Sequence, residues 1–409
     1  MAKGESKATN TEVHLFILWE NARQIEEQII ADISKKFKVL KAYEVCWSQE
    51  KFSENLSRFY GTKLPTNSRK EAHVGTEPFL AVVVEDRQPI YKVHTTTKGD
   101  MAVNTNLFTS KTLHREWTGG GHRIHATNTA EEADHDLMLL FGKTGADFLS
   151  EFNQSQSPLV ERWEKDLVGS DGWANLSELF KVLNATVRYV VLRNFELMPD
   201  KFYFGKHGDI DLLVENYKDA QLIINSRPVF SHKYRVHHEV RIGQDNVRLD
   251  LRFVGDSYYD ERWEKAILAG RQLRQGAFYI PAERDYFFSL LYHALIHKTE
   301  ISSDYINRLS AIAQTANLKM VVGSFRVDGA RALADFLLET GYAYTQPYDK
   351  SVYFNQANAA VGINRGARRL RSGTTPLRNY LKQAKVPLKH YAAKAKRIAQ
   401  RRLNKLFNR

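Results

Sequence analysis

Apolar and polar positions alternate in short segments over the first 145 residues, and longer stretches between these segments have helical spacing. The runs Val13–Trp19 and Phe79–Glu85 are typical of buried strands, and Val39–Trp47 alternates as another strand. Apolar residues three and four positions apart predict a helix from Ala22 to Phe37 and a second helix that Ser48 caps. Together these elements predict a small α/β sheet.

A further helix is expected at the end of this first domain. Thr129 is a favoured N-cap residue, acidic side chains fill the turn after it, and apolar spacing continues from Ala130 to Phe141. The order of strands and helices is compatible with a ferredoxin-like sheet, so we expect an α/β domain over residues 12–145. Residues 146–180 contain loop signals, such as Gly169-Ser170-Asp171-Gly172, and are expected to form a connector.

The pattern after residue 180 predicts a second domain with a mixed sheet, over residues 181–300. A short helix from Leu176 to Leu183 is expected to lead into a strand, and further strands are expected up to Val254. The last helix of this domain is expected at Tyr286–Lys298. Residues 301–364 have helical spacing and predict a helical region without recognisable chemistry. We therefore expect a multidomain protein of the α/β and α+β classes.

Three aspartates in the second domain are the clearest chemical signal. Side chains alternate between the faces of a strand, so Asp209 and Asp211 point the same way, while the residues between and after them are apolar. Asp250 lies between two leucines in the same alternation. If the two strands pair, three carboxylates converge, which is unfavourable without a cation. Mg²⁺, or Mn²⁺ in its place, suits such oxygen ligands and leaves positions for substrate phosphates.

The alternative interpretation is that these aspartates lie on a solvated strand face, since a D-x-D pattern is short enough to occur by chance. The apolar residues around them favour a buried strand. Arg248 and Arg252 are each two positions from Asp250, so they are expected on the same face of the strand. They are candidates either for binding phosphate oxygens or for simple ion pairs. Lys298, at the end of its helix, is a candidate for holding a substrate phosphate, and the alternative is an ordinary solvated lysine.

The D-x-D strand and the distant third Asp, each flanked by apolar residues, resemble the nucleotidyltransferase superfamily. The segments Tyr189–Asn194, Leu197–Pro199 and Asp209–Val214 are similar to its sugar-decorating branch, which includes LicD- and fukutin-like transferases and proteins encoded with polysaccharide-assembly genes. Members usually carry Gly-Ser or Gly-Gly before the D-x-D strand, where this chain has Leu192-Arg193-Asn194. Arg193 would replace that phosphate cradle with a charge-assisted contact.

This resemblance, which covers residues 180 to 300, implies metal-dependent transfer of a nucleotidyl or phosphoryl group. It implies that Asp209, Asp211 and Asp250 hold the metal and the donor's phosphates, with Asp250 as a candidate base. The candidate donor-binding residues are Arg193, Asn194, Gly208, Arg248, Arg252 and Lys298. The implied substrates are a nucleotide or CDP-linked donor and a glycan or lipid-linked acceptor.

Residues 12–145 are similar to a nucleoside diphosphate kinase domain in which several positions have changed. The similarity is carried by His122–Ala133, and it makes His125 the phosphoryl-accepting histidine. Glu20 stands where these kinases have a phosphate-binding lysine, and a carboxylate there would repel a triphosphate. A related fold with a different use is therefore favoured, and a structural role for His125 is the alternative to catalysis.

Composition limits the cellular location. The chain has 409 residues, 43% of them hydrophobic, and a single cysteine, Cys46, so no disulfide can form within the chain. Residues 1–10 are polar and lack the apolar core of a signal peptide. No apolar run reaches the roughly 18 residues that predict a membrane span. We expect a cytoplasmic protein.

The net charge of +12 comes from residues 365–409. This tail has fifteen Lys and Arg and no acidic residue, which leaves 44 basic and 47 acidic residues elsewhere. Apolar residues such as Leu381, Leu388 and Ile398 recur at helical spacing, interrupted at Pro387, so the tail is amphipathic. It suits an anionic membrane surface, which we favour over RNA because no RNA-binding motif is present. A solvated, disordered tail is the other alternative.

Three hypotheses follow for the whole chain. The first is an enzyme of the nucleotidyltransferase superfamily, peripherally associated with a membrane. The second is a phosphotransferase of the nucleoside diphosphate kinase type that acts through His125. The third is a protein without catalysis that binds a nucleotide or RNA.

Overall fold

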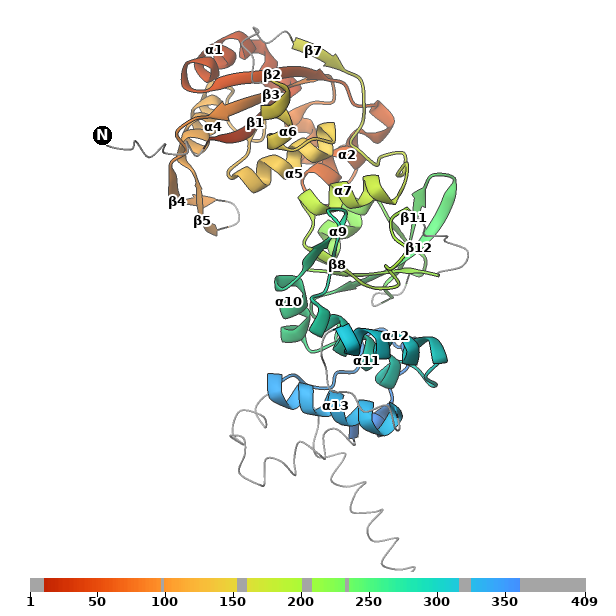
Figure 1. Ribbon diagram of the computed structural model, residues 1–409. Coiled ribbons are helices and arrows are strands. Elements are labelled where there is room, and N and C mark those ends of the chain that lie inside the picture. The colour runs from red at the N-terminus through yellow and green to blue at the C-terminus, as the bar shows by residue number, and fades with distance from the viewer. Residues whose placement is uncertain are drawn as a thin grey trace, which may run out of the picture. The chain divides into compact units, whose positions relative to one another are not determined.

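The computed structural model describes residues 11–96, 99–152, 160–200, 208–231, 235–315 and 325–360 (Figure 1). These residues form helices, two five-stranded mixed sheets and two hairpins. They divide into two compact units: one extends to Val254 and includes Glu264–Ala282, and the other comprises Gly255–Trp263 and the residues from Glu283 onward. The basic tail, for which a membrane surface is expected, lies outside the described residues.

The first sheet has the strand order β6-β1-β3-β2-β7. Its strands are β1 (Glu12–Leu18), β2 (Lys38–Val45), β3 (Phe79–Asp86), β6 (Ile124–Ala126) and β7 (Val160–Trp163). All neighbours are antiparallel except β2 and β7. Every residue of the central strand β3 is buried, because helices cover the sheet.

The helices around this sheet are mostly short. They are η1 (Glu20–Ile25), α1 (Glu26–Lys36), η2 (Gln49–Lys51), α2 (Phe52–Phe59), α3 (Arg69–Val74), α4 (Thr105–Trp117), α5 (Ala130–Phe141) and α6 (Gly145–Glu151). Phe16, Val82 and Ile33 share one core in which α1 and the sheet meet, and α5 and α6 also pack against β1. A hairpin of β4 (Tyr91–Thr96) and β5 (Gly99–Asn104) was not predicted from the sequence.

The two predicted N-caps of this part have different outcomes. Thr129 accepts a hydrogen bond from the Glu132 amide, and α5 has the predicted bounds. The prediction that Ser48 caps the next helix was wrong, because its side chain makes no capping bond. The Ser48 hydroxyl instead donates to Asp166 Oδ2 at 2.8 Å. A partner distant in sequence has replaced the local cap.

The second sheet has the order β10-β11-β12-β9-β8. Its strands are β8 (Tyr189–Arg193), β9 (Ile210–Val214), β10 (Arg227–Pro228), β11 (His237–Ile242) and β12 (Asp245–Phe253). Only β9 and β12 are parallel neighbours. The helices α7 (Leu176–Thr186) and α9 (Tyr217–Ile224) and the hairpin β13 (Gln272–Arg274) with β14 (Phe278–Ile280) accompany it.

Both sheets belong to the same compact unit, and Arg58 on α2 joins them. Its side chain is 1% exposed. The guanidinium donates to four oxygens, which are the carbonyls of Val168, Leu222 and Ile223 and the hydroxyl of Ser170. Burial lowers the pKa of Arg58 to about 10, although the charges of Glu54 and Asp166 oppose this effect. The four hydrogen bonds help to offset the cost of burying this cation.

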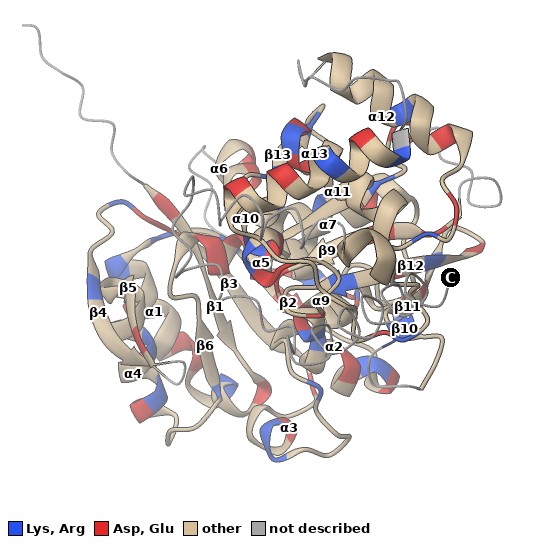
Figure 2. Cartoon of the chain, turned by 90° about the horizontal axis from the view of Figure 1, so that it is seen from below, with Lys and Arg blue, Asp and Glu red and all other residues tan. Residues whose placement is uncertain are grey.

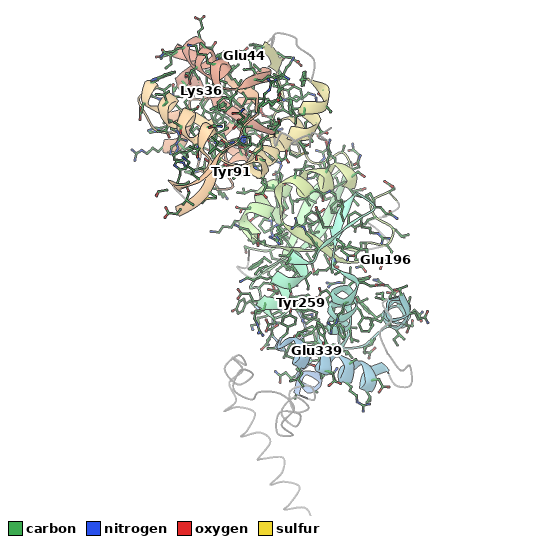
Figure 3. All side chains as sticks on the ribbon, turned by 60° about the vertical axis from the view of Figure 1, so that its left-hand side comes forward. Lys36, Glu44, Tyr91, Glu196, Tyr259 and Glu339 are labelled. Carbon is green, nitrogen blue, oxygen red and sulfur yellow. The ribbon has the colours of Figure 1, made fainter. Side chains whose placement is uncertain are left out.

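The second unit is helical, as expected for residues beyond 300, and it also includes α11. Its helices are α11 (Glu283–Ile296), α12 (Ser303–Thr315) and α13 (Phe325–Thr340), while α10 (Glu261–Ala269) spans the division between the units. Tyr259, labelled in Figure 3, packs its ring 4.9 Å from that of Trp263 and 5.3 Å from that of Tyr292. None of the helices described here is long and apolar enough to cross a membrane.

Acidic and basic residues are interspersed along the described elements (Figure 2). This agrees with the sequence, in which the 44 basic and 47 acidic residues before the tail nearly balance. A strong one-signed field is therefore expected only from the tail, and local clusters decide the chemistry elsewhere.

Candidate active site

Four side chains lie side by side across the second sheet. Arg193 on β8 pairs in register with Asp211 on β9, Asp211 with Asp250 on β12, and Asp250 with His237 on β11. Register partners on neighbouring strands project from the same face of a sheet. We call these four residues the carboxylate row. The prediction that the two acidic strands are neighbours is confirmed.

Asp211 is the buried centre of the carboxylate row. Its side chain is 6% exposed, and its Oδ1 accepts a hydrogen bond from Arg193, which is equally buried. The Asn194 amide lies 3.5 Å from the other oxygen. Burial raises the pKa of Asp211 to about 6, and the charge of Asp250 adds to this effect, while Arg193 opposes it. The ion pair therefore compensates burial only in part.

Asp250 is half-buried and has a weaker set of partners. The Nε2 atom of His237 lies 3.7 Å from its Oδ1 atom. That oxygen is buried and accepts no hydrogen bond from any described residue. A buried acceptor without a donor carries a free-energy penalty of about 1–3 kcal/mol. Such an atom indicates that a cation or another donor belongs beside it.

Asp209 directly precedes β9 and is the third acid of the site. Burial raises its pKa, and the charge of Asp250 raises it further, whereas Arg248 lowers it. Arg252 in turn lowers the pKa of Asp211. Each arginine thus favours the charged form of one acid, which agrees with their expected position on the same strand face as Asp250. Gly208, just before Asp209, has a φ of 74°, a left-handed conformation that favours glycine.

The donor set suits Mg²⁺ or Mn²⁺ in its chemistry. Three carboxylates interact repulsively, and one buried oxygen of Asp250 lacks a donor, so a hard divalent cation would relieve both. Within the part of the chain that is described, no three His, Cys, Asp or Glu side chains are arranged as ligands of one ion. Arg193 already binds an oxygen of Asp211, and a metal ion would have to compete with it.

The remaining predicted donor-binding residues occupy different places. Arg193 was expected to contact phosphate, and it forms an ion pair with Asp211. Asn194 follows it with a φ of 62° and turns the chain sharply after β8. Lys298 belongs to the second unit, where it is exposed shortly after α11.

Two adjacent histidines on β11 have separate environments. His237 belongs to the carboxylate row, whereas His238 is buried with the Tyr217 hydroxyl 2.7 Å from Nε2 and the Ser226 hydroxyl 3.0 Å from Nδ1. Burial lowers the pKa of His238 to about 4. The sequence left both histidines unassigned. Strand alternation separates them, but the register with Asp250 is needed to say which one faces the acids.

His125 in the first sheet forms a second polar site. It lies on β6, and its Nε2 atom is 2.7 Å from Oδ2 of the buried Asp136. Burial would raise the pKa of Asp136, but hydrogen bonds from His125 and His135 bring it below its usual value. The rings of Phe59 and Tyr60 lie 5.3 and 5.9 Å from the imidazole. Asp136 thus fixes one ring nitrogen.

Basic side chains contact two residues that adjoin His125, the ring of Tyr60 and the backbone of Ile124. Lys70 Nζ lies 3.0 Å from the centre of the Tyr60 ring, and Arg115 donates to the Ile124 carbonyl at 2.9 Å. Burial lowers the pKa of Lys70 to about 8, with a contribution from Arg115. No carboxylate among the described residues forms an ion pair with either cation. Burial lowers the pKa of His122, and the charges of Lys70 and Arg115 lower it further. We call Lys70, Arg115 and His122 the basic cluster.

Glu20, which was expected to repel phosphate, has its own partners. Its Oε2 atom accepts hydrogen bonds from the amides of Thr76 and Glu77 at 2.7 and 3.0 Å. Backbone amides offset the charge of a carboxylate that they bind. The expected repulsion of a phosphate near His125 is therefore weaker than the sequence alone suggested.

No protein-family model matches the chain, and no curated protein is significantly similar to it. The carboxylate row and the His125 site are therefore the evidence from which a function can be inferred. Of the two, the carboxylate row brings together more of the side chains that the sequence marked for chemistry.

Proposed function

We propose that the chain is a metal-dependent transferase of the nucleotidyltransferase superfamily. It moves a nucleotidyl or phosphoryl group from a nucleotide or CDP-linked donor. The observation that carries this proposal is the register match of Asp211 with Asp250 on parallel strands, with Asp209 at the start of the same strand. Carboxylates that approach one another from neighbouring strands support a metal-assisted transfer, because a divalent cation can bind them and a phosphate together.

The residues of the site have distinct roles in this proposal. Asp209, Asp211 and Asp250 hold Mg²⁺ or Mn²⁺, which when bound neutralises and orients the donor's phosphates. Asp250 would also accept a proton from the acceptor hydroxyl, and its buried oxygen without a donor supports this role. Arg248 and Arg252 stabilise charge on the phosphate oxygens.

The architecture supports the same families that the sequence resembles. The order β6-β1-β3-β2 with α1 and α4 contributing to one core supports a ferredoxin-like first domain. The mixed second sheet, in which only β9 and β12 run parallel, supports a nucleotidyltransferase fold. The proposed acceptor is a glycan or lipid-linked precursor. This follows from the resemblance to sugar-decorating transferases and from the basic amphipathic tail, which suits a peripheral position on an anionic membrane.

A thermal-shift experiment tests this function. Nucleoside triphosphates and CDP-linked donors are added with and without Mg²⁺ or Mn²⁺, and a ligand at 100 times its Kd should stabilise the protein by about 2.7 kcal/mol. Stabilisation should require the metal and should be lost in Asp250→Asn. Glu215→Gln, an exposed acid just after β9, is the matched control. No stabilisation by any donor in the wild type would refute the proposal.

The second candidate function is a phosphotransferase that acts through His125. The basic cluster favours it, because cations without carboxylate partners stand beside a histidine that Asp136 orients. The imidazole nitrogen not held by Asp136 would take the terminal phosphoryl group of a nucleoside triphosphate, as the bond to the departing diphosphate breaks. A site that binds a nucleotide without transfer, the third hypothesis, would share the same cations.

Labelling with γ-³²P-ATP separates these possibilities. The second candidate requires an acid-labile phosphohistidine that is lost in His125→Ala and persists in His135→Ala, since His135 also bonds Asp136. Absence of label in the wild type would exclude transfer through His125. Metal-independent nucleotide binding without label would then favour the third hypothesis for this domain.

A further inference from the structure

Phe230 is an aromatic side chain left 44% exposed beside the carboxylate row. It follows β10 by two residues. The guanidinium carbon of Arg235 lies 4.1 Å from the centre of its ring, and the imidazole of His237 stands edge-on to it, with centroids 5.7 Å apart and an angle of 83°. Two neighbouring side chains therefore fix where this exposed ring lies.

A single residue connects this ring to the acids. His237 contacts the Phe230 ring on one side, and its Nε2 atom lies 3.7 Å from Asp250 Oδ1 on the other. If the phosphates of a ligand bind at Asp250, the opposite end of that ligand would reach the apolar ring of Phe230. A nucleotide has this division, because a charged phosphate chain and a planar base stand at opposite ends of one sugar.

We propose that Phe230 is the platform on which the base of the donor nucleotide stacks. This inference rests on the proposed transferase function and adds the residue that recognises the base. A guanidinium over one face of an aromatic ring is attracted by the ring's negative potential. Arg235 thus holds the ring in place, and the 44% of Phe230 that remains exposed is open to a ligand. Each base has such a face, so the platform selects a nucleotide over bare phosphate without selecting one base.

A sugar ring of the acceptor is the rival occupant. The surroundings favour the base, because the platform is continuous through His237 with the residues assigned to the donor's phosphates. Val229, the preceding residue, is also 40% exposed but has no ring, so it provides a matched control for loss of exposed apolar surface.

The test is isothermal titration calorimetry of the full-length chain in the presence of Mg²⁺, with ATP, CTP and tripolyphosphate as ligands. Phe230→Ala should weaken ATP and CTP by about five- to 150-fold, the range that removal of one base–aromatic stack produces. Tripolyphosphate, which has no base, should bind Phe230→Ala as it binds the wild type. Phe230→Trp should restore nucleotide affinity, Phe230→Leu should not, and Val229→Ala should have no effect.

Several results would overturn the inference. Equal losses for nucleotides and tripolyphosphate would mean that Phe230 supports the carboxylate row and not the base. Full affinity in Phe230→Ala, or rescue by leucine, would exclude stacking, and a sugar-binding role would then become the better explanation. A wild type that binds none of the three ligands, or tripolyphosphate alone, would refute the transferase function and this inference with it. Nucleotide binding that Phe230→Ala leaves unchanged would refute only the inference.

Discussion

Asp211 and Asp250 occupy matched positions on the parallel strands β9 and β12, yet only Asp211 has a buried arginine as its partner. The two acids therefore differ in what they contribute to the stability of the metal-free protein. Asp250 mainly adds repulsion, because its charge raises the pKa values of both Asp211 and Asp209. Asp211 neutralises a buried guanidinium as well as taking part in that repulsion.

Asp250→Asn should stabilise the metal-free protein by about 1 kcal/mol, since removing one charge relieves the two neighbouring acids. The same substitution should abolish stabilisation by Mg²⁺ with a nucleotide. Thermal denaturation with and without both ligands measures the two effects together. A lowered melting temperature without metal would contradict the inferred repulsion.

Asp211→Asn should have the opposite effect on the metal-free protein. The buried Arg193 loses its carboxylate, and breaking a buried ion pair from one side destabilises proteins by about 3–5 kcal/mol. Urea denaturation of the two single variants under the same conditions tests the contrast. Equal shifts of the two variants would show that Arg193 does not depend on Asp211.

The buried His238 predicts a loss of stability in acid. Burial lowers its pKa from 6.5 to about 4, so between these values the unfolded chain binds a proton that the folded protein excludes. The contribution to stability is present above about pH 6.5 and is lost as the pH falls toward 4, by about 3 kcal/mol in total. His238→Gln should therefore show a smaller fall in the free energy of unfolding between pH 7 and pH 4.5. A parallel fall in both proteins would rule out this role.

Arg58 should be essential to the first unit. Arg58→Ala removes four hydrogen bonds at once, among them those to the carbonyls of Val168 and Ile223. Each buried group left unsatisfied costs about 1–3 kcal/mol. We expect a loss of several kcal/mol in urea denaturation and faster proteolysis between the two sheets. Arg162→Ala, which removes an exposed ion pair with Glu164, should leave both measurements unchanged. Full stability of Arg58→Ala would mean that other contacts hold the sheets together.

Alternation and helix caps were sufficient to predict the elements with strong local signals. The strand of Asp211 and the helix after Thr129 were found because apolar spacing and local chemistry agree there. The β4–β5 hairpin was missed because most of its residues are exposed. Without a buried face, its sequence has no regular alternation of apolar and polar residues. Ser48 was assigned as a cap because the sequence cannot indicate a partner as distant as Asp166.

Only the part of the candidate site that depends on side-chain alternation within a strand could be predicted from the sequence. Alternation predicted a shared face for Asp209 and Asp211, and the parallel pairing of β9 with β12 brings Asp250 beside Asp211. The positions of Arg193 and His237 depend on the register of two more strands, which no local pattern encodes. Their roles as the flanking cation and imidazole of the carboxylate row therefore emerged only from the fold.

The last prediction concerns the basic tail, which separates a membrane-associated transferase from a nucleic-acid binder. Deleting residues 365–409 removes fifteen cations and should release the protein from anionic liposomes, since each basic residue near such a surface contributes about 1 kcal/mol. Replacing Leu381, Leu388 and Ile398 together with Ser keeps every charge. A membrane-bound helix should then lose much of its affinity, because the buried apolar face contributes separately. RNA binding, which depends on counterion release, should hardly change. Undiminished liposome co-sedimentation of the triple variant would mean that the tail acts only as a polycation.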